Sequence, residues 1–380
     1  MLEDINLTVS TGEKIALIGR NGAGKTTLFK LICSELSPDS GHVQKPGNFK
    51  IGYLSQHFDF DESRSIKDVC MDVFKEYFEI ENRINNLNEE LTQLTDEARI
   101  TALLEELESL NMKQQASVES HPLSDMARIL KGLGFKETQF DDEISKLSGG
   151  WKMRVQIAKL LLMKPDLLLL DEPDNHLDIE ALIWFEKYVL SYPGAVLFIS
   201  HDVEFMSNTA NRILELSNRR ISDYKCNYKK YLEERSLRRE KDEQAFVNQQ
   251  KQIKQKERTI NRFMAKATKT KMAQSMQKQL DKIERIEIES DDFTNINISF
   301  PHTSQSGKKV LELKGISKSY GDNKVIDNLN MVVERGKKIA FVGQNGQGKS
   351  TLVKIIAGAI KPDQGEVELG HNVMSSYFAQ

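Results

Sequence analysis

The sequence has few cysteines and no long hydrophobic run, and these two absences exclude whole classes of protein. Its 380 residues include three cysteines, which are odd in number and far apart: Cys33, Cys70 and Cys226. They predict reduced thiols in a cytoplasmic protein and exclude a disulfide or zinc framework. The most apolar region, 157–170, is interrupted by charged residues and a proline. No run approaches the roughly 18–20 residues of a membrane span, so no membrane partner is expected.

Two further absences concern targeting and charge. Met1 is followed by acidic Glu3 and Asp4 instead of a basic segment and an apolar core, so no secretory signal is expected. The formal net charge is −3 although 29% of the residues are charged. Such a balance argues against nonspecific affinity of the whole chain for nucleic acid. The local distribution of charge therefore matters more than the total.

What the sequence does contain is a phosphate-binding motif near its start. Residues 19–26, GRNGAGKT, fit the P-loop pattern G-x-x-x-x-G-K-[ST]. The aliphatic run 15–18 predicts a buried parallel strand before the motif, and residues 27–33 have helical character. In that context the glycines let backbone N–H groups surround anionic oxygens, Lys25 would reach the β- and γ-phosphates, and the Thr26 hydroxyl would bind Mg²⁺. The flanking strand and helix disfavour the alternative of a chance glycine turn.

The same motif occurs a second time. Residues 343–350, GQNGQGKS, follow the apolar run 339–342. The two copies keep a constant offset of 324 positions, so that Lys25 matches Lys349. A repeat of this length predicts two homologous nucleotide-binding domains. The first would cover 1–224, and the second would be the N-terminal part of a domain at 310–380.

Residues 75–115 change character within the first domain. Apolar residues recur there at spacings of three and four, first at Ile80, Ile84, Leu87, Leu91 and Leu94 and then at Ile100, Leu103, Leu107 and Leu110. This pattern predicts an antiparallel helical hairpin with one coiled-coil seam. The low aromatic content and many polar residues favour a protruding arm. A helix pair packed inside the domain is the alternative.

Polar residues follow several predicted strands and one predicted turn. Gln56 ends the strand 51–56, Asp171 and Glu172 follow the buried run 167–170, and His201 follows the run 195–199. Open α/β sheets place ligands at such strand ends. The segment 147–151, LSGGW, precedes a helix that Ser148 can cap, and its two glycines allow close approach of a phosphate. Taken alone, His201 could equally be a capping or core histidine.

A second helical hairpin is predicted at 225–309, between the two domains. Phe246, Ile253 and Ile260 recur every seven residues, and Met272, Met276, Leu280 and Ile283 form a second seam. From Gln244 to Gln279 there are nine basic residues and a single acidic one, Glu257. This concentration of charge suits a phosphate backbone, whereas an ordinary solvated helix face would alternate in sign. The expected RNA contacts lie near the tip, at Arg262, Lys266, Lys269 and Lys271.

Taken in order, these motifs form a specific set. The chain resembles an ATP-binding cassette (ABC) ATPase, and the resemblance covers nearly all of it. Two cassettes joined by a long basic helical linker are similar to the F subfamily (ABC-F). So are residues 149–154, in and after the signature segment LSGG (147–150), and residues 175–178, after Asp171-Glu172. Asp174 stands where the family usually has Thr. The resemblance implies α/β P-loop NTPase domains of ABC type, with a helical arm and a helical-hairpin linker.

The resemblance also implies roles for individual residues. Asp171, Thr26 and Gln56 would hold Mg²⁺ in the first cassette. Ser350 would be a Mg²⁺ ligand in the second. Glu172 would act as general base, His201 would contact the γ-phosphate, and Gln56 would sense Mg²⁺ and the γ-phosphate. Tyr320 would stack on adenine. The remaining nucleotide-binding positions would be Gly19, Asn21, Gly22, Gly24, Lys25, Thr27, Ser148, Gly149, Gly150, Gly343, Asn345, Gly346, Gly348, Lys349, Thr351 and Gln380.

In the family, ATP lies between the P-loop of one cassette and the signature of the other. The sequence contains one signature and one Asp171-Glu172 pair for two P-loops. Both composite sites are therefore expected to be incomplete, as in a fragment truncated at both ends. We expect nucleotide binding, weak hydrolysis by the chain alone, and rescue in a head-to-tail homodimer.

The leading functional interpretation is an ATPase that acts on the ribosome in translation. The resemblance implies contact with rRNA and tRNA, with the helical hairpin of the linker, at 225–290, directed toward the tRNA. Two alternatives stay open. One is the ATPase subunit of a transporter, for which the basic linker is unexpected. The other is a DNA-maintenance ATPase, which would carry a far longer coil than the 75–115 segment.

Overall fold

The computed structural model describes residues 2–55, 61–93, 97–117, 121–264, 270–281, 305–321, 323–343 and 346–378. The chain divides into two compact units, one of residues 1–176 and 184–294 and the other of residues 295–380 with 177–183. Within the described ranges, no helix has both the length and the apolar character that crossing a membrane requires.

The first unit is built on a six-stranded sheet with the order β2-β3-β4-β1-β5-β6. Its strands are β1 (Lys14–Gly19), β2 (Ile51–Leu54), β3 (Leu167–Asp171), β4 (Ala195–Ile199), β5 (Arg212–Ser217) and β6 (Arg220–Tyr224). Neighbouring strands run parallel except for the β5–β6 pair. The predicted apolar runs form the buried strands β1, β3 and β4. Because these strands are parallel, the polar residues that follow them meet at one edge of the sheet.

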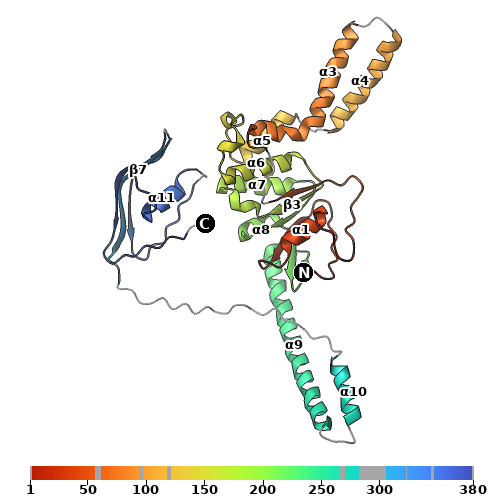
Figure 1. Cartoon of the computed structure of the whole chain (residues 1–380), viewed down its shortest axis with the longest axis vertical. Coiled ribbons are helices and arrows are strands. Elements are labelled where there is room, and N and C mark those ends of the chain that lie inside the picture. The colour runs from red at the N-terminus through yellow and green to blue at the C-terminus, as the bar shows by residue number, and fades with distance from the viewer. Residues whose placement is uncertain are drawn as a thin grey trace. The chain divides into compact units, whose positions relative to one another are not determined.

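Helices cover both faces of this sheet (Figure 1). They are α1 (Lys25–Cys33), α5 (Pro122–Gly132), α6 (Gly149–Leu162), α7 (Ile179–Ser191) and α8 (Val203–Thr209). On one face, Phe29 of α1 packs with alternate strand residues such as Leu17 and Leu197. On the other face, Phe198 of β4 contacts Phe205 of α8 with ring centroids 5.0 Å apart. Alternation along each strand thus supplies both halves of the core.

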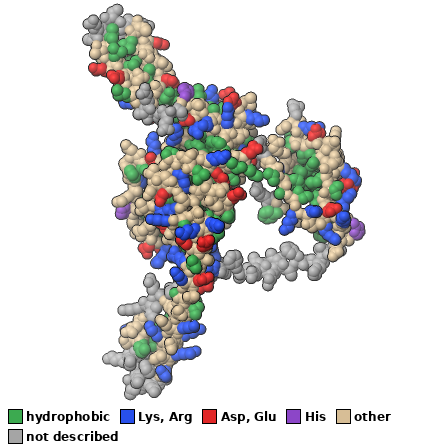
Figure 2. All heavy atoms as spheres, turned by 180° about the vertical axis from the view of Figure 1, so that it is seen from behind, with side chains coloured by type: hydrophobic (Ala, Val, Ile, Leu, Met, Phe, Trp, Pro, Cys, Tyr) green, Lys and Arg blue, Asp and Glu red, His purple; other side chains and the backbone are tan. Residues whose placement is uncertain are grey.

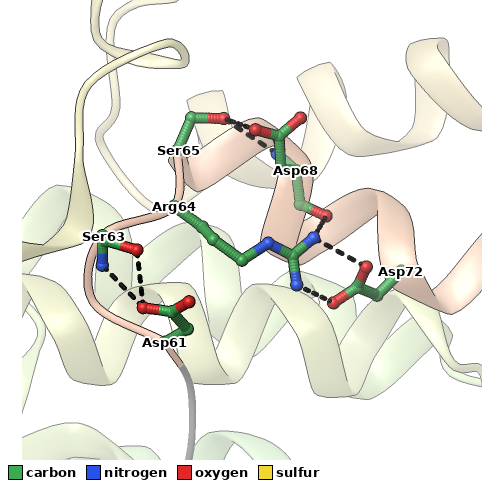
Figure 3. Close-up of polar contacts among 6 residues, drawn as sticks. All are labelled: Asp61, Ser63, Arg64, Ser65, Asp68 and Asp72. Carbon is green, nitrogen blue, oxygen red and sulfur yellow. Dashed lines mark hydrogen bonds and ion pairs between the residues drawn. The ribbon is translucent and has the colours of Figure 1, made fainter.

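An ion pair fixes the entry to the short helix α2 (Ile66–Met71). Arg64 donates to both carboxylate oxygens of Asp72, at 2.7 and 2.8 Å, as Figure 3 shows. Ser65 caps the helix by accepting from the Asp68 N–H at 3.1 Å. A serine cap and a two-point guanidinium contact together hold a helix too short to be stable alone.

The helical hairpin predicted at 75–115 is confirmed as α3 (Lys75–Gln93) and α4 (Glu97–Ser117), which run antiparallel in Figure 1. Leu87 is fully buried in it, and Arg83 donates to Glu106 across the pair at 2.9 Å. The hairpin projects as an arm, so the alternative of a pair packed inside the domain is wrong.

The second predicted hairpin consists of α9 (Tyr228–Met264) and α10 (Thr270–Asp281), which lie side by side. Ile253, Ile260 and Leu280 form its buried contact, with Met276 packed against them. Four of the predicted seam residues therefore face each other across the pair, whereas Phe246 is not part of this contact and the side chain of Met272 is not described. Ile283 lies outside the described residues.

The second unit contains a three-stranded antiparallel sheet with the order β8-β7-β9. Its elements are β7 (Lys309–Tyr320), β8 (Asn323–Glu334), α11 (Lys349–Ile356) and β9 (Gln364–Leu369). Leu352 and Ile355 of α11 pack against Leu313 and Ile316 of β7. The run 339–342, which matches β1 by repeat, forms no strand, and Val342 is 71% exposed. In the first unit the matching strand, β1, lies between β4 and β5 and is buried.

Candidate functional site

The first P-loop forms the turn between β1 and α1. Gly22 and Gly24 have φ angles of +80° and +110°, a region that other residues enter only with strain. Gly19 is needed for another reason, because a Cβ there would lie 2.7 Å from the Leu216 carbonyl oxygen of β5. Lys25 Nζ donates to the Gly19 carbonyl oxygen at 2.7 Å, so its ammonium lies within the loop. Burial lowers the pKa of Lys25, and nearby carboxylates partly oppose that shift.

The described part of the second P-loop, residues 343 and 346–350, shares two features with the first. Gly346 and Gly348 have φ angles of +87° and +84°. Lys349 Nζ donates to the Gly343 carbonyl oxygen at 2.6 Å, as Lys25 does to Gly19. Ser350 and Thr351 follow in the first turn of α11. The described residues of the second loop, 343 and 346–350, therefore repeat these features of the first, although only the first loop follows a strand.

Two side-chain oxygens of the kind that bind a hard cation meet beside the first P-loop. Thr26 Oγ1 donates to Asp171 Oδ2 at 3.0 Å, although the two residues lie far apart in the sequence. Asp171 is the buried last residue of β3. Burial raises the pKa of Asp171, and the hydrogen bond from Thr26 opposes this shift.

These two residues fit Mg²⁺. No group of three or more His, Cys, Asp or Glu side chains that could hold a metal occurs in the described part of the chain. Mg²⁺ does not need such a cage, because it is usually held by one or two protein oxygens while substrate phosphates and water complete its octahedron. Thr26 and Asp171 are oxygen ligands of this kind, next to the loop that would hold the phosphates.

Glu172 follows β3 in a strained conformation. Its φ angle is +51°, which costs a residue with a side chain about 1–2 kcal/mol. A hydrogen bond of 2.9 Å from its N–H to the Ile199 carbonyl oxygen of β4 holds this backbone in place. Its Oε2 accepts from Asn175 Nδ2 at 2.6 Å, and its Oε1 lies 3.5 Å from His201 Nε2. The polar residues that follow β3 and β4 therefore meet at one edge of the sheet.

His201 is neither a core nor a capping histidine. Its side chain is 60% exposed. Asp202 caps α8 instead, accepting from the N–H groups of Glu204 at 2.8 Å and Phe205 at 3.1 Å. The imidazole is thus available to a ligand at the sheet edge.

Asp174, the departure from the family pattern, lies in the short turn Pro173–His176. Burial raises its pKa, and Oδ1 has no hydrogen-bond partner among the described residues. The turn nevertheless brings the next residue, Asn175, to the carboxylate of Glu172. Sequence reasoning did not identify Asn175 as a site residue. Its position one helical turn after Glu172 was the available signal, because residues three apart lie on one face.

The signature serine does not behave as predicted. Ser148 occupies the N-cap position of α6, but its side chain makes no capping hydrogen bond, so that expectation is wrong. The hydroxyl is exposed, and a Cβ at Gly149 or Gly150 would meet nothing within 4 Å. The first turn of α6 therefore has no side-chain cap and open space around its glycines, as an anion-binding helix end requires.

The remaining predicted residues are of two kinds. Gln56, Asn345, Gln380, Lys266 and Lys269 lie outside the described residues, and the side chain of Lys271 is not described. Asn21 is exposed in the first loop, and Arg262 is exposed near the end of α9. Tyr320 ends β7 and is 50% exposed, with Lys318 Nζ 5.7 Å from its ring centroid. An exposed ring is compatible with stacking on a base, which stays a prediction.

Comparison with known proteins gives family matches along most of the chain. A family model described as "ABC transporter" matches residues 2–175 and 326–378, and a second with the same description matches 214–300. ABC transporter F family member 2 of Arabidopsis thaliana is 36% identical over 386 residues, covering 100% of this chain and 57% of that protein. A Bacillus subtilis protein, "Uncharacterized ABC transporter ATP-binding protein YfmM", is 33% identical over 384 residues, covering 100% of this chain and 73% of that protein.

Coverage and structural similarity set the limits of this comparison. The chain spans less than three fifths of the length of F family members 2 and 5 of Arabidopsis thaliana, at 57% and 56%. A solved structure titled "Structure of ATP binding subunit of ABC transporter" has a TM-score of 0.45 and 19% identity, covering 62% of this chain and 88% of that chain. That likeness is too distant to add to the assignment, which rests on the family matches and on the sequence identity. The chain belongs to the ATP-binding cassette family and, within it, to the F subfamily.

Proposed function

We propose that this chain binds MgATP at its two P-loops and hydrolyses ATP with the residues at the first. One observation carries the proposal. Lys25 and Thr26 after β1, Asp171 and Glu172 after β3, and His201 after β4 gather at one edge of a parallel sheet. This is the set of groups that phosphoryl transfer needs, since its catalysis consists of positioning and charge neutralisation.

Each group has a role in the proposed reaction. The loop N–H groups and the Lys25 ammonium would bind the β- and γ-phosphates. Thr26 and Asp171 would hold Mg²⁺, which neutralises phosphate charge when it is bound. Glu172 would accept a proton from the attacking water, and His201 would donate a hydrogen bond to the γ-phosphate. Since phosphoryl transfer develops charge on the γ-phosphate oxygens, these donors would stabilise the transition state more than the ground state.

Isothermal titration with MgATP tests nucleotide binding. The wild type is expected to bind two ATP per chain, and Lys25→Met and Lys349→Met should each leave one, because both lysines contact their own loop in the same way. Lys30→Met is the matched control, since Lys30 is an exposed lysine on the same helix as Lys25. Absence of ATP binding by the wild type would refute the proposal.

We propose further that the partner is the ribosome, contacted through RNA. The support is the charge of the α9–α10 hairpin, where Figure 2 shows Lys and Arg side chains along the projection. Lys251, Lys254 and Arg258 are exposed at i, i+3 and i+7 of α9, away from the buried Ile253 and Ile260. Among the described residues, none of the three is in an ion pair. A continuous cationic face of this kind suits a phosphate backbone.

Cosedimentation with ribosomes in the presence of MgATP tests this partner. Binding should weaken as salt rises, and replacement of Lys266, Lys269 and Lys271 by Glu should weaken it further. Unchanged pelleting of that variant would refute a role of the tip.

The proposed organisation is a first ABC domain at 1–224, a basic linker at 225–309 and part of a second ABC domain at 310–380. The head-to-tail homodimer stays a prediction.

A further inference from the structure

The carboxylate of Glu172 is held on one side by a residue with no assigned role. Asn175 Nδ2 donates to Glu172 Oε2 at 2.6 Å. The other carboxylate oxygen, Oε1, lies 3.5 Å from His201 Nε2, which is beyond a short hydrogen bond. The two oxygens therefore differ: Oε2 already accepts a hydrogen bond, while Oε1 faces the imidazole.

Asn175 is suited to orient the carboxylate and unsuited to a role in packing. It is exposed in the turn Pro173–His176, so the core does not depend on its side chain. A neutral amide donates a hydrogen bond without adding a charge that would compete with a cation or a phosphate. The backbone of Glu172 is fixed independently, by its hydrogen bond to Ile199 and its left-handed φ angle of +51°. With the backbone fixed, the amide of Asn175 selects the side-chain orientation.

We propose that Asn175 is a positioning residue for Glu172: by holding Oε2 it presents Oε1, on the side of His201, to the attacking water. This inference rests on the proposed ATP hydrolysis. The water gives its proton to Oε1 as its oxygen bonds to the γ-phosphorus. The bond between that phosphorus and the β–γ bridging oxygen breaks, so that ADP leaves and inorganic phosphate remains.

The test compares ATP hydrolysis with ATP binding in Asn175 variants. Hydrolysis is followed in single turnover with the whole chain in excess, so that a slow reaction still yields a rate. Asn175→Ala is expected to lower this rate about 10- to 100-fold, since a misplacement of a reacting group by about 1 Å can cost about 100-fold. Its affinity for MgATP should stay within about twofold of the wild type, because Asn175 acts after binding. Asn175→Asp keeps the shape and repels Glu172, so its rate should fall at least as far.

The chain offers a matched control. Asn208 of α8 donates to Glu186 at 3.3 Å in a second exposed Asn–Glu pair. Asn208→Ala should leave both rate and affinity unchanged. In a Glu172→Gln background, Asn175→Ala should slow the reaction no further, because residues that act as one unit are not additive.

The outcomes separate the inference from the proposed function. Absence of ATP binding by the wild type would overturn the proposed function. A wild-type rate equal to that of Glu172→Gln would overturn the role of Glu172 and, with it, that of Asn175. A rate for Asn175→Ala within twofold of a wild type that outpaces Glu172→Gln would overturn the role of Asn175 alone. An additional loss from Asn175→Ala in the Glu172→Gln background would do the same.

Discussion

The cationic face of α9 gives a prediction whose size follows from helix geometry. Lys251 and Arg258, with Lys254 between them, are seven steps apart, or about 10 Å at 1.5 Å per residue. A nucleic-acid strand advances about 3.4 Å per nucleotide, so this span can meet up to three phosphates. Each contact contributes roughly 0.7–0.9 to the dependence of log K on log salt concentration. Replacing all three residues by Gln should therefore make that slope shallower by about 2–3.

Fluorescence anisotropy with a labelled RNA hairpin at several salt concentrations measures this slope. Between 50 and 200 mM salt, the wild type should lose about 20- to 40-fold more affinity than the variant. The control removes three charges from the same helix, at Lys230, Arg238 and Arg239, each of which forms an i,i+4 ion pair with an acid. The slope of log K against log salt concentration for that variant should differ from the wild-type slope by less than about one. Equal slopes for the wild type and the test variant would refute phosphate contact by this face.

Two predictions concern stability and one concerns the hairpin. Gly52→Ala should destabilise the first unit by about 1–3 kcal/mol in urea unfolding, because its Cβ would lie 2.8 Å from a proline ring, whereas Gly47→Ala, in open space, should be neutral. Arg212 lowers the pKa of Asp223, so the pair stabilises the fold above about pH 4 and does so progressively less as the pH falls below that value. Asp223→Asn should therefore make the free energy of unfolding fall less steeply at acid pH. Ile260→Ala should increase amide exchange in α10, since Ile260 is 2% exposed in the hairpin contact.

The helices and strands that could be predicted from the sequence are those whose own residues show a clear hydrophobic pattern. β4 and the first four residues of β3 are uninterrupted apolar runs of about the length of a strand, so buried parallel strands were the expected structure. The two hairpins have apolar residues at spacings of three, four and seven, which only a helix places on one face. The run at 339–342 is apolar throughout, as residues 15–18 of β1 are, and still forms no strand. A strand depends on its neighbours in the sheet, which composition does not reveal.

In the site, too, some features could be predicted from the sequence and others depend on the folded structure. The positions of Lys25, Glu172 and His201 could be predicted, because each lies beside a buried strand and parallel strands bring their ends together. The contact between Asn175 and Glu172 could not, since it depends on how the turn after β3 winds. Ser148 makes no capping hydrogen bond to α6. Serine is a residue type that favours the N-cap position, but the type alone does not determine whether its side chain makes the bond.

The two P-loops separate what the chain fixes locally from what the sheet supplies. The second and third glycines of each loop have positive φ angles, and Lys25 and Lys349 each donate to the first glycine carbonyl of their own loop. Only the first loop is preceded by a buried strand. If backbone N–H groups and a helix end suffice for phosphate, Lys25→Met should leave a second site that still binds ATP. If the strand is needed to hold the loop, that remaining site should bind far more weakly than the one left by Lys349→Met. The ratio of the two dissociation constants thus measures how much of the binding depends on the sheet.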